Sequence, residues 1–358
     1  MEEKSIMWRY MAQEEDILRA LLRDESIAAA AERLALGTER ICFVAHGSSY
    51  NAAMTAVDLI ARAVDVPVQA MTPANFLYNG AGLLQVDCGG TLVVAISQTG
   101  TSSGVLDALR EAKRLGFRTL GVTDIAASPM GTEPDDVLLL RCGEEDSNAK
   151  TKGYSATLML LMLLGIRMGL SRGTLDQSCA QKMLHELELQ AGELELVHQR
   201  VLGWCRENSF GHALRDLYVL GYGMNFGTAM EGQLKLMETA CIPTMFNDIG
   251  EFSHGMHRSI TEKSSILLLR TDHPLAALME ETFHYLRGIT EHTLLLDAAD
   301  GAAEEVGRIA IPAHPLTQSV LLLTRAVQVL SVYAPEQQGL DPNRNAHDDF
   351  TQVVHTRV

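Results

Sequence analysis

The chain has 358 residues, a formal net charge of −16 and 47% hydrophobic residues. This length exceeds a single ordinary core, so two domains are expected. The acidic balance disfavours nucleic acid as a partner, and no apolar stretch runs long enough without polar breaks to predict a membrane span. The most apolar stretch, "ATLMLLMLLGIRMGL", is short and holds an arginine, so a buried core helix is predicted there.

The N-terminal stretch "MEEKSIMWRYM" is acidic at its start and lacks the basic start and apolar region of a signal peptide. The six cysteines form no CxxC pair and stand at positions 42, 88, 142, 179, 205 and 241. Several lie in apolar runs, so we expect reduced thiols in a cytoplasmic protein rather than a disulfide framework.

Residues 8–36 are predicted to be helical, and a strand is predicted at 41–45. A Gly-Ser-Ser loop and a further helix follow in "AHGSSYNAAM". Parallel α/β sheets bind ligands at the carboxyl ends of their strands, where this loop would lie. We interpret His46 as a loop histidine, with a ligand contact as the alternative.

The stretch "TLVVAISQTGTSS" at 91–103 joins a buried strand to a loop rich in hydroxyl groups. Apolar residues recur at helical spacing from Val105 to Leu115, and Gly116 is predicted to end that helix before the strand "RTLGVTD". The loop therefore lies at a helix N-terminus, where free N–H groups and the helix dipole favour an anion. Ordinary helix capping is the alternative. The number of hydroxyls favours a phosphate site. Because the net negative charge of the chain repels anions, the phosphate must be captured by the local geometry of the loop.

The chain contains an internal repeat. "ICFVAHGSSYNAAM" (41–54) matches "LYVLGYGMNFGTAM" (217–230) at an offset of 176, and Gly47 aligns with Gly223. Later strands match at similar offsets, namely "TLVVAI" with "SSILLL" and "RTLGVTD" with "HTLLLDA". The pattern predicts an α/β fold of two doubly wound parallel sheets in tandem, flanked by helices. In the second copy, "RTDHPLA" replaces the hydroxyl-rich loop.

The helix "FGTAMEGQLKLMETA" places Glu231, Lys235 and Glu238 on one face. A solvated Glu–Lys face is the common interpretation, and a proton-transferring carboxylate is the alternative. A long loop, "CIPTMFNDIGEFSHGMHRSI", is expected next and carries Glu251, His254 and a second histidine. Its histidines could act as acid or base beside the helical carboxylate. No further ligand cluster supports a metal site, so none is predicted.

Five stretches together resemble the tandem sugar isomerase (SIS) domains of the glucosamine-6-phosphate synthase isomerase half, and also the related fructosamine-6-phosphate deglycases. They are "HGSSYNA", "SQTGTSSGVLDALREAKRLG", "NAKTKGYS", "AMEGQLKLMETACIP" and "GEFSHG". The resemblance implies N-terminal helices at 1–36, SIS domains at 37–171 and 210–340, a helical linker at 172–209 and a tail over the active site at 341–358.

The resemblance also implies roles for individual residues. A sugar phosphate would be bound by Ser49, Ser97, Gln98, Thr99 and Ser102. Glu238 would move protons at the sugar carbons, His254 would open the ring, and Lys235 is the helical lysine of the family motif. The histidine of the synthase comes from the neighbouring subunit, which implies a homodimer. Further candidate substrate contacts are Ser48, Lys150, Lys152, Glu251, His347 and Asp348.

Two departures from the synthase affect the expected function. Glu2 stands where the synthase has a catalytic cysteine, and no amidotransferase domain is expected, so glutamine would not supply ammonia. After Arg344 and Asn345, the tail has His347 and Asp348 in place of the synthase lysine. An acidic tail suits an amine-bearing substrate, which favours a fructosamine 6-phosphate deglycase.

Two kinds of alternative remain open. One is a glucosamine-6-phosphate deaminase or an aldose–ketose isomerase, and the other is a non-catalytic sugar-phosphate-binding regulator. The expected ligand is in each case a small sugar phosphate, and no cofactor is predicted.

Overall fold

The computed structural model describes residues 5–80, 88–212, 214–344, 346–347 and 349–354. Contacts divide the chain into two compact units. We call residues 16–144, 152–185 and 345–358 the N-terminal sheet unit, and residues 1–15, 145–151 and 186–344 the C-terminal sheet unit. The chain passes between the units several times, so each unit is assembled from separate segments.

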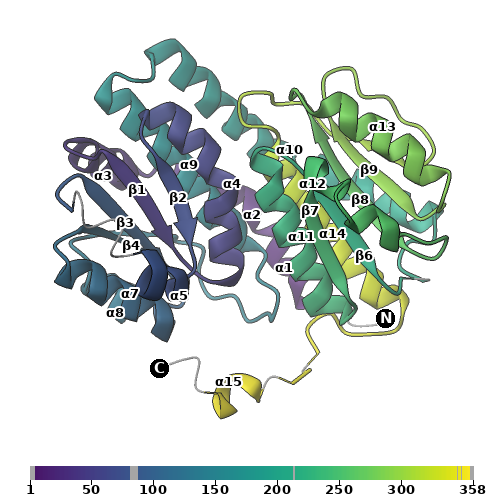
Figure 1. The fold of residues 1–358 in the computed structure, drawn as a ribbon, viewed down its shortest axis with the longest axis horizontal. Helices are drawn as coiled ribbons and strands as arrows, with labels where there is room; N and C mark the ends of the chain where they lie inside the picture. The colour runs from purple at the N-terminus through teal and green to yellow at the C-terminus, as the bar shows by residue number, and fades with distance from the viewer. Residues whose placement is uncertain (1–4, 81–87, 213, 345, 348, 355–358) are drawn as a thin grey trace. The chain divides into compact units, whose positions relative to one another are not determined.

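The N-terminal sheet unit is built on a five-stranded parallel sheet in the order β2-β1-β3-β4-β5. The strands are β1 (Arg40–Val44), β2 (Val68–Met71), β3 (Thr91–Ile96), β4 (Arg118–Thr123) and β5 (Asp136–Leu139). The helices are α2 (Glu14–Leu22), α3 (Glu25–Ala35), α4 (Gly47–Val64), α5 (Pro73–Asn75), α7 (Ser103–Arg114), α8 (Pro129–Thr132) and α9 (Lys152–Arg172), with a π-helix at Phe76–Gly80 and α15 (Phe350–Val353) in the tail. In Figure 1, α7 and α8 lie on one side of the sheet, and α4 and α9 pack together on the other.

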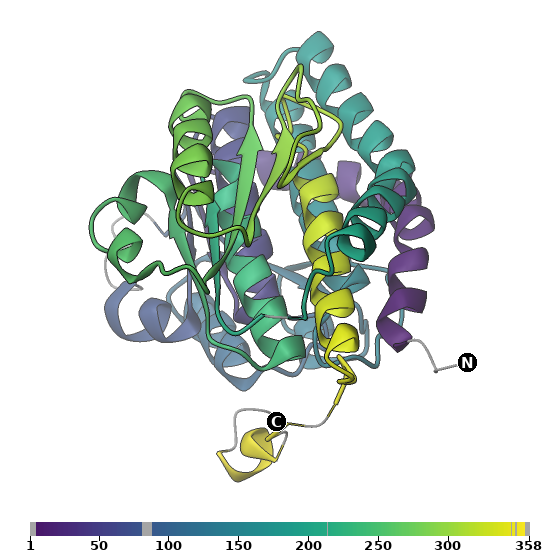
Figure 2. The same cartoon turned by 90° about the vertical axis from the view of Figure 1, so that its right-hand side faces the viewer.

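The C-terminal sheet unit repeats this plan in the order β10-β9-β8-β6-β7. Its strands are β6 (Leu217–Gly221), β7 (Thr244–Asp248), β8 (Ser265–Thr271), β9 (Thr293–Ala298) and β10 (Arg308–Ala310). Its helices are α1 (Ile6–Ala12), α11 (Met224–Ala240), α12 (Ile249–Phe252), α13 (Ala276–Arg287) and α14 (Val320–Gln337), with a 3-10 helix at Met256–Ser259. Helix α10 (Gln177–Glu207) begins in the N-terminal sheet unit and continues in this one from residue 186. Figure 2 shows α11 (green) and α14 (yellow) side by side, and α13 packs on the strands from the other face.

The prediction of two doubly wound parallel sheets in tandem is confirmed. Read from opposite ends, the two strand orders are the same, and each strand of the first sheet has a counterpart in the second. The aligned glycines both have a positive φ, 55° at Gly47 and 54° at Gly223. A side chain is disfavoured there, which explains why both copies have glycine.

Two expectations about particular segments were wrong. The predicted long loop after α11 contains the edge strand β7, whose last four residues are half-buried. Helix α9 is long and apolar enough to cross a membrane by length and composition, contrary to the expectation from its polar breaks. Because 89% of its most apolar window is buried inside the protein, it serves here as the predicted core helix.

Other sequence expectations agree with the structure. All six cysteines are free, and Cys42, Cys142 and Cys205 are buried. Burial raises the pKa of the Cys42 thiol to about 12, which makes it unreactive at neutral pH.

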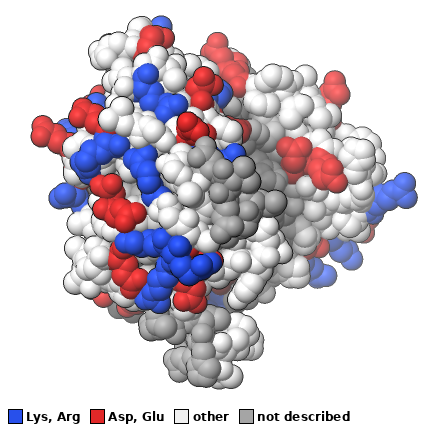
Figure 3. Space-filling model, turned by 60° about the vertical axis from the view of Figure 1, so that its left-hand side comes forward, with Lys and Arg blue, Asp and Glu red and all other residues white. Residues whose placement is uncertain are grey.

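On the face of the molecule in Figure 3, acidic and basic side chains are interspersed. Exposed pairs such as Arg110–Glu133 illustrate this local charge compensation. Pairs of this kind contribute little to stability.

Candidate active site

The hydroxyl-rich loop of the N-terminal sheet unit is a tight turn between β3 and α7. The Gly100 amide donates a hydrogen bond to the Ser97 carbonyl at 3.0 Å. Gly100 has φ +72°, and a Cβ placed there would lie 1.9 Å from Ser128 Oγ. Only glycine fits this turn, because both the backbone conformation and the neighbouring hydroxyl exclude a side chain.

Three of the predicted phosphate-binding hydroxyls make no hydrogen bond to another residue in the described part of the chain. They belong to Ser49, Ser97 and Ser102. Ser102 is the N-cap residue of the twelve-residue helix α7, yet its side chain does not cap that helix. The Thr99 and Thr101 hydroxyls, in contrast, bond to each other at 3.1 Å. The loop therefore presents donors at a helix N-terminus, an arrangement suited to an anion.

The Gly-Ser-Ser segment after β1 lies beside the hydroxyl-rich loop, and it forms the first turn of α4 rather than the predicted loop. Parallel pairing aligns Val44 with Ala95, so the two strands end at the same edge of the sheet. A Cβ on Gly104 would lie 3.2 Å from His46 Cε1, which shows how closely the start of α7 approaches the N-cap residue of α4. Burial lowers the pKa of His46 although part of the residue remains exposed, so its ring is neutral at pH 7.

Gln98 points from the same loop toward helix α9. Its amide donates a weak hydrogen bond to Cys142 Sγ at 3.7 Å, and a Cβ on Gly153 would lie only 2.3 Å from the Gln98 amide. Lys152, at the first position of α9, is 4% exposed. Gln98 thus packs against the start of α9, close in sequence to a buried lysine.

Two of the three charged residues on one face of α11 in the C-terminal sheet unit, Glu231 and Lys235, are buried rather than solvated. Lys235 Nζ lies 2.7 Å from Glu231 Oε1, and these two side chains are 0% and 1% exposed. Burial alone would lower the pKa of Lys235, but the charges of Glu231 and Glu238 raise it overall. For Glu231 and Lys235 the interpretation as a solvated pair is therefore wrong, and Lys235 is a fixed buried cation.

Glu238 is one turn further along α11. Burial raises the pKa of its carboxyl to about 7, the Lys235 charge opposes this rise, and Glu231 adds to it. The residue is nevertheless more than a third exposed, so its carboxyl is both crowded by protein atoms and open to solvent. A carboxyl group that titrates near neutral pH can both accept and return a proton.

Residues 145–151 form a loop that packs in this unit, and we call it the crossing loop. Its organising residue is Glu145, which sequence reasoning missed. The buried Glu145 carboxylate accepts hydrogen bonds from the Thr151 amide at 2.5 Å and from the Thr151 hydroxyl at 2.8 Å. Gln328 of α14, also missed, donates to the Thr151 carbonyl at 3.3 Å. Lys150 Nζ donates to the Glu145 carbonyl at 2.5 Å.

The segment before the tail connects the crossing loop to the C-terminal end of α11. The Asn148 amide donates to Asn343 Oδ1 at 2.6 Å, and the Asn148 side chain donates to the Arg344 carbonyl at 3.1 Å. Arg344 in turn donates to the Thr239 carbonyl at 2.7 Å. Because Thr239 follows Glu238, these bonds hold the crossing loop near the Glu238 end of the helix.

The predicted histidine is not joined to this cluster. His254 lies in an exposed turn, and in the described part of the chain no contact links it to Glu238. Glu251 and His347 are also exposed. Asp348 lies outside the described residues. The structure therefore brings together Glu238, Lys235 and Lys150, but not His254.

The second copy fills both of its potential anion sites with its own groups. At the N-terminus of α11, the Met224 amide donates to Gln318 Oε1 at 3.1 Å. In place of the hydroxyl-rich loop stands Asp272, whose carboxylate accepts the Asp300 amide at 3.0 Å. A bound anion would have to displace the first group and would be repelled by the second.

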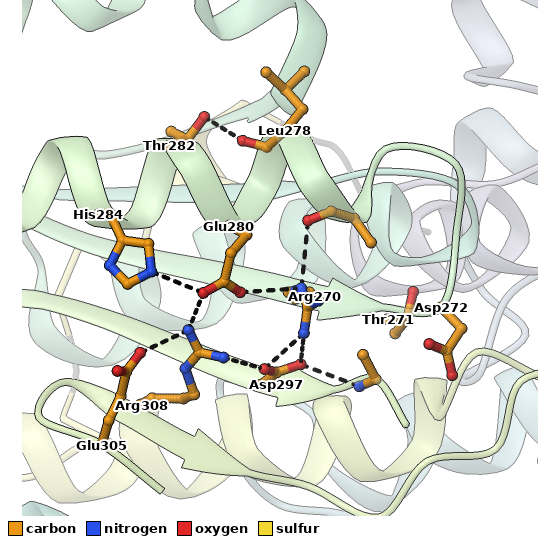
Figure 4. A network of polar contacts seen from close by, with 12 residues as sticks. Arg270, Thr271, Asp272, Leu278, Glu280, Thr282, His284, Asp297, Glu305 and Arg308 are labelled. Carbon is orange, nitrogen blue, oxygen red and sulfur yellow. Dashed lines mark hydrogen bonds and ion pairs between the residues drawn. The ribbon is translucent and has the colours of Figure 1, made fainter. Parts of the chain in front are cut away.

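A second charged cluster joins α13 to the sheet (Figure 4). Asp297 is fully buried and accepts hydrogen bonds from Arg270 at 2.9 Å and from Arg308 at 2.8 Å. Glu280, His284 and Glu305 lie close enough together to hold a metal ion. Arg308 already pairs with both of these glutamates, so the cluster acts as a structural clamp.

One cavity of about 440 Å³ lies at the amino ends of β8 and β9. Its lining includes Trp204, Phe210, Arg287 and His292, and none of the predicted site residues.

Comparison with known proteins agrees with this fold. Residues 37–167 match the family model of the SIS domain. This match covers the sheet of the N-terminal sheet unit, and a second sheet of the same strand order follows it in the chain.

Its curated relatives include the isomerizing glutamine–fructose-6-phosphate aminotransferase of Symbiobacterium thermophilum, at 31% identity over 85% of this chain and 50% of the relative. This chain spans about half the length of the curated relatives it matches. Among solved structures, the C-terminal domain of glucosamine-fructose-6-phosphate aminotransferase from Francisella tularensis superimposes with a TM-score of 0.84, at 20% identity over 96% of this chain and 99% of that chain. Glucosamine-6-phosphate deaminase from Thermotoga maritima superimposes with a TM-score of 0.74, at 18% identity over 95% of this chain and 97% of that chain.

Proposed function

We propose that this protein is a fructosamine 6-phosphate deglycase, which releases an amine and a hexose 6-phosphate. The observation that carries the proposal is Glu238, whose pKa is raised to about 7 one turn from a buried cation. Such a carboxylate can take a proton from carbon and give it back at neutral pH. The relationship to sugar-phosphate enzymes of the SIS class supports the same chemistry.

The proposed reaction is a hydrolysis that begins with a proton shift. Glu238 removes a proton from C1 of the ketosamine, giving an enolamine, and returns a proton to C2, giving an imine at C1. Water adds to this imine, and the C–N bond breaks to release the amine and an aldose 6-phosphate. Lys235 fixes a positive charge beside the carboxylate, and each placed acid or base contributes typically ~10²–10⁴-fold to the rate.

The hydroxyl-rich loop is proposed to bind the 6-phosphate through Ser97 and Ser102, with Ser49 from the first turn of α4. Binding energy at the phosphate, far from the reacting carbons, orients the substrate for proton transfer. His254 is proposed to open the sugar ring. Because its turn is exposed and no described contact joins it to Glu238, we assign it to the site of the partner subunit in a homodimer. Six free thiols suit a cytoplasmic location.

A product assay tests this proposal against its closest alternatives. The protein is incubated separately with a fructosamine 6-phosphate, glucosamine 6-phosphate and fructose 6-phosphate, and glucose 6-phosphate, fructose 6-phosphate and free amine are measured. Glucose 6-phosphate and amine from the first substrate support the deglycase. Fructose 6-phosphate and ammonia from the second would identify a deaminase, and interconversion of the hexose phosphates alone would identify an isomerase.

The Glu238→Gln variant then tests the proposed base. It should still bind sugar phosphate but lose turnover by at least about a hundredfold, and deuterium from solvent should no longer enter C2 of the product. The exposed Glu262 provides a matched control, and Glu262→Gln should behave as the parent protein. Parent-rate turnover by Glu238→Gln would refute the assignment.

A further inference from the structure

The cavity at the amino ends of β8 and β9 has no part in the proposed reaction. Its volume of about 440 Å³ lies within the range of cavities that hold small molecules. It is lined entirely by residues of the C-terminal sheet unit, and none of the predicted site residues is among them. The cavity therefore shares no residue with the proposed substrate site.

Two aromatic side chains form part of the cavity wall. Trp204 lies near the end of α10, and Phe210 lies in the turn that follows this helix. Their ring centroids are 6.0 Å apart, the ring planes are tilted by 54°, and both residues are half-buried. Leu214 and Leu294 add aliphatic surface. A wall of this composition favours a ligand with an aromatic ring, because rings pack well in tilted arrangements.

Arg287, the last residue of α13, brings a positive charge to the same cavity. Its Nη1 donates to the Glu291 carbonyl at 3.0 Å. A Cβ on Gly307 would lie 2.9 Å from this nitrogen, and Gly307 has φ +79°, a conformation that favours glycine. The guanidinium is therefore held by a carbonyl on one side and packs against a backbone that has no side chain on the other.

The charge of Arg287 is not balanced by a neighbouring carboxylate. Within the described residues it forms no ion pair, and its one hydrogen bond is to the neutral carbonyl of Glu291. Arg270 and Arg308 of the same unit, in contrast, pair with buried Asp297. The remaining N–H groups of the Arg287 fork can donate to an anion that enters the cavity.

We propose that this cavity binds an aromatic carboxylate, with the ring against Trp204 and Phe210 and the carboxylate on Arg287. The planar guanidinium matches a carboxylate through two parallel hydrogen bonds. Arg287 is the only lysine or arginine in the lining, and Glu291 also lines the cavity. One cation beside an acidic residue suits a singly charged carboxylate better than a doubly charged phosphate. The proposal goes beyond the proposed reaction and does not depend on it.

Phenylacetate and phenylacetamide test the proposal, because they are nearly equal in size and differ in charge. Calorimetry on the full chain should show a Kd of about 1 mM or below for phenylacetate, as expected for a ligand of this size. Phenylacetamide should bind at least about tenfold more weakly, since hydrogen bonds to charged groups are the stronger ones.

Variants of Arg287 separate recognition of the charge from folding. Arg287→Met should lose at least about tenfold in affinity for phenylacetate and change little toward phenylacetamide. Arg287→Lys keeps the charge but not the planar fork, so its affinity for phenylacetate should be intermediate. The exposed Arg9 of α1 supplies the control, and Arg9→Met should bind as the parent protein does. Urea unfolding of each variant verifies that it is folded.

Tryptophan fluorescence identifies the place of binding. Phenylacetate should change the emission of the parent protein, whose two tryptophans are Trp8 and Trp204. Trp204→Phe keeps an aromatic ring in the wall and should lose this change, whereas Trp8→Phe should retain it. Saturating glucose 6-phosphate should not displace the probe, because the cavity and the proposed substrate site share no residue.

Three results would overturn the proposal. They are equal affinity for the acid and the amide, an equal fall for both in Arg287→Met, and displacement of the probe by glucose 6-phosphate. No binding of phenylacetate at ten times the expected Kd would overturn it as well. No step of the test measures turnover, so a failure of the deglycase proposal is detected separately in its own product assay.

Discussion

Replacing Lys235 by Met tests the buried ion pair that underlies the proposed base. The Nζ–Oε1 distance to Glu231 is 2.7 Å, and both side chains are almost fully buried. At an effective dielectric constant of 20, the attraction at this distance is about 6 kcal/mol, and desolvation of the two ions offsets much of it. Removing one partner leaves the other charge buried, so Lys235→Met should lower the free energy of unfolding by about 3–5 kcal/mol.

The double variant Lys235→Met/Glu231→Gln removes both charges and should be more stable than the single variant by about 2 kcal/mol or more. Urea unfolding followed by tryptophan fluorescence suits this measurement. Both tryptophans, Trp8 and Trp204, lie in the C-terminal sheet unit with the pair, so their signal reports on that unit. Protein concentration is held constant across the variants, because association shifts apparent stability. Equal stability of the single and double variants would refute the argument that a lone buried charge causes the loss.

Four further outcomes are expected. The raised pKa of Glu238 predicts that kcat/KM rises with pH and levels off above about 7, and a pH–rate profile without this limb would contradict the assignment. The folded protein holds the Glu238 proton to higher pH than the unfolded chain, so the contribution of this proton to stability is complete below pH 4.5 and is lost as pH rises through about 7. The difference in thermal stability between the parent protein and Glu238→Gln should therefore fall across that pH window, and a constant difference would count against the raised pKa. The double variant Ser97→Ala/Ser102→Ala should weaken sugar-phosphate binding with little change in thermal stability, and unchanged affinity would exclude the loop as the phosphate site. Gly100→Ala should weaken binding and also destabilise the fold by about 1–3 kcal/mol, as measured by urea unfolding. Mixing Glu238→Gln and His254→Ala protomers should restore activity, and no recovery after demonstrated subunit exchange would place both residues in one chain.

The repeat made most of the fold predictable. Central strands such as β1, β3 and β6 are short apolar runs followed by a glycine or hydroxyl-rich segment and a helix, and two such series at similar offsets define two sheets. Strand β7 was missed because it is an edge strand, half-buried along most of its length, and its residues Thr244–Asp248 are mixed in polarity. Edge strands lack the continuous apolar run that marks a central one.

The candidate site was predictable only in part. Spacing placed Glu231, Lys235 and Glu238 on one face of a helix, but a solvated pair and a buried pair have the same spacing. What distinguishes them is the packing of α11 against α14, a contact between segments roughly a hundred residues apart. Glu145 was missed for the same reason, since its partners are set by how the crossing loop folds and packs.

The filling of the α11 N-terminus by Gln318 makes the two copies unequal in their response to ligand. The Met224 amide at the N-terminus of α11 already donates to the Gln318 side chain of the same protein chain, so phosphate gains nothing by binding there. In the hydroxyl-rich loop of the N-terminal sheet unit, the Ser97 and Ser102 hydroxyls have no such internal partner in the described part of the chain. By mass action, a ligand at a hundred times its Kd stabilises the unit that binds it by about 2.7 kcal/mol. Saturating phosphate should therefore raise the unfolding temperature of one half of the molecule and leave the other half, with both tryptophans, to unfold where it did before.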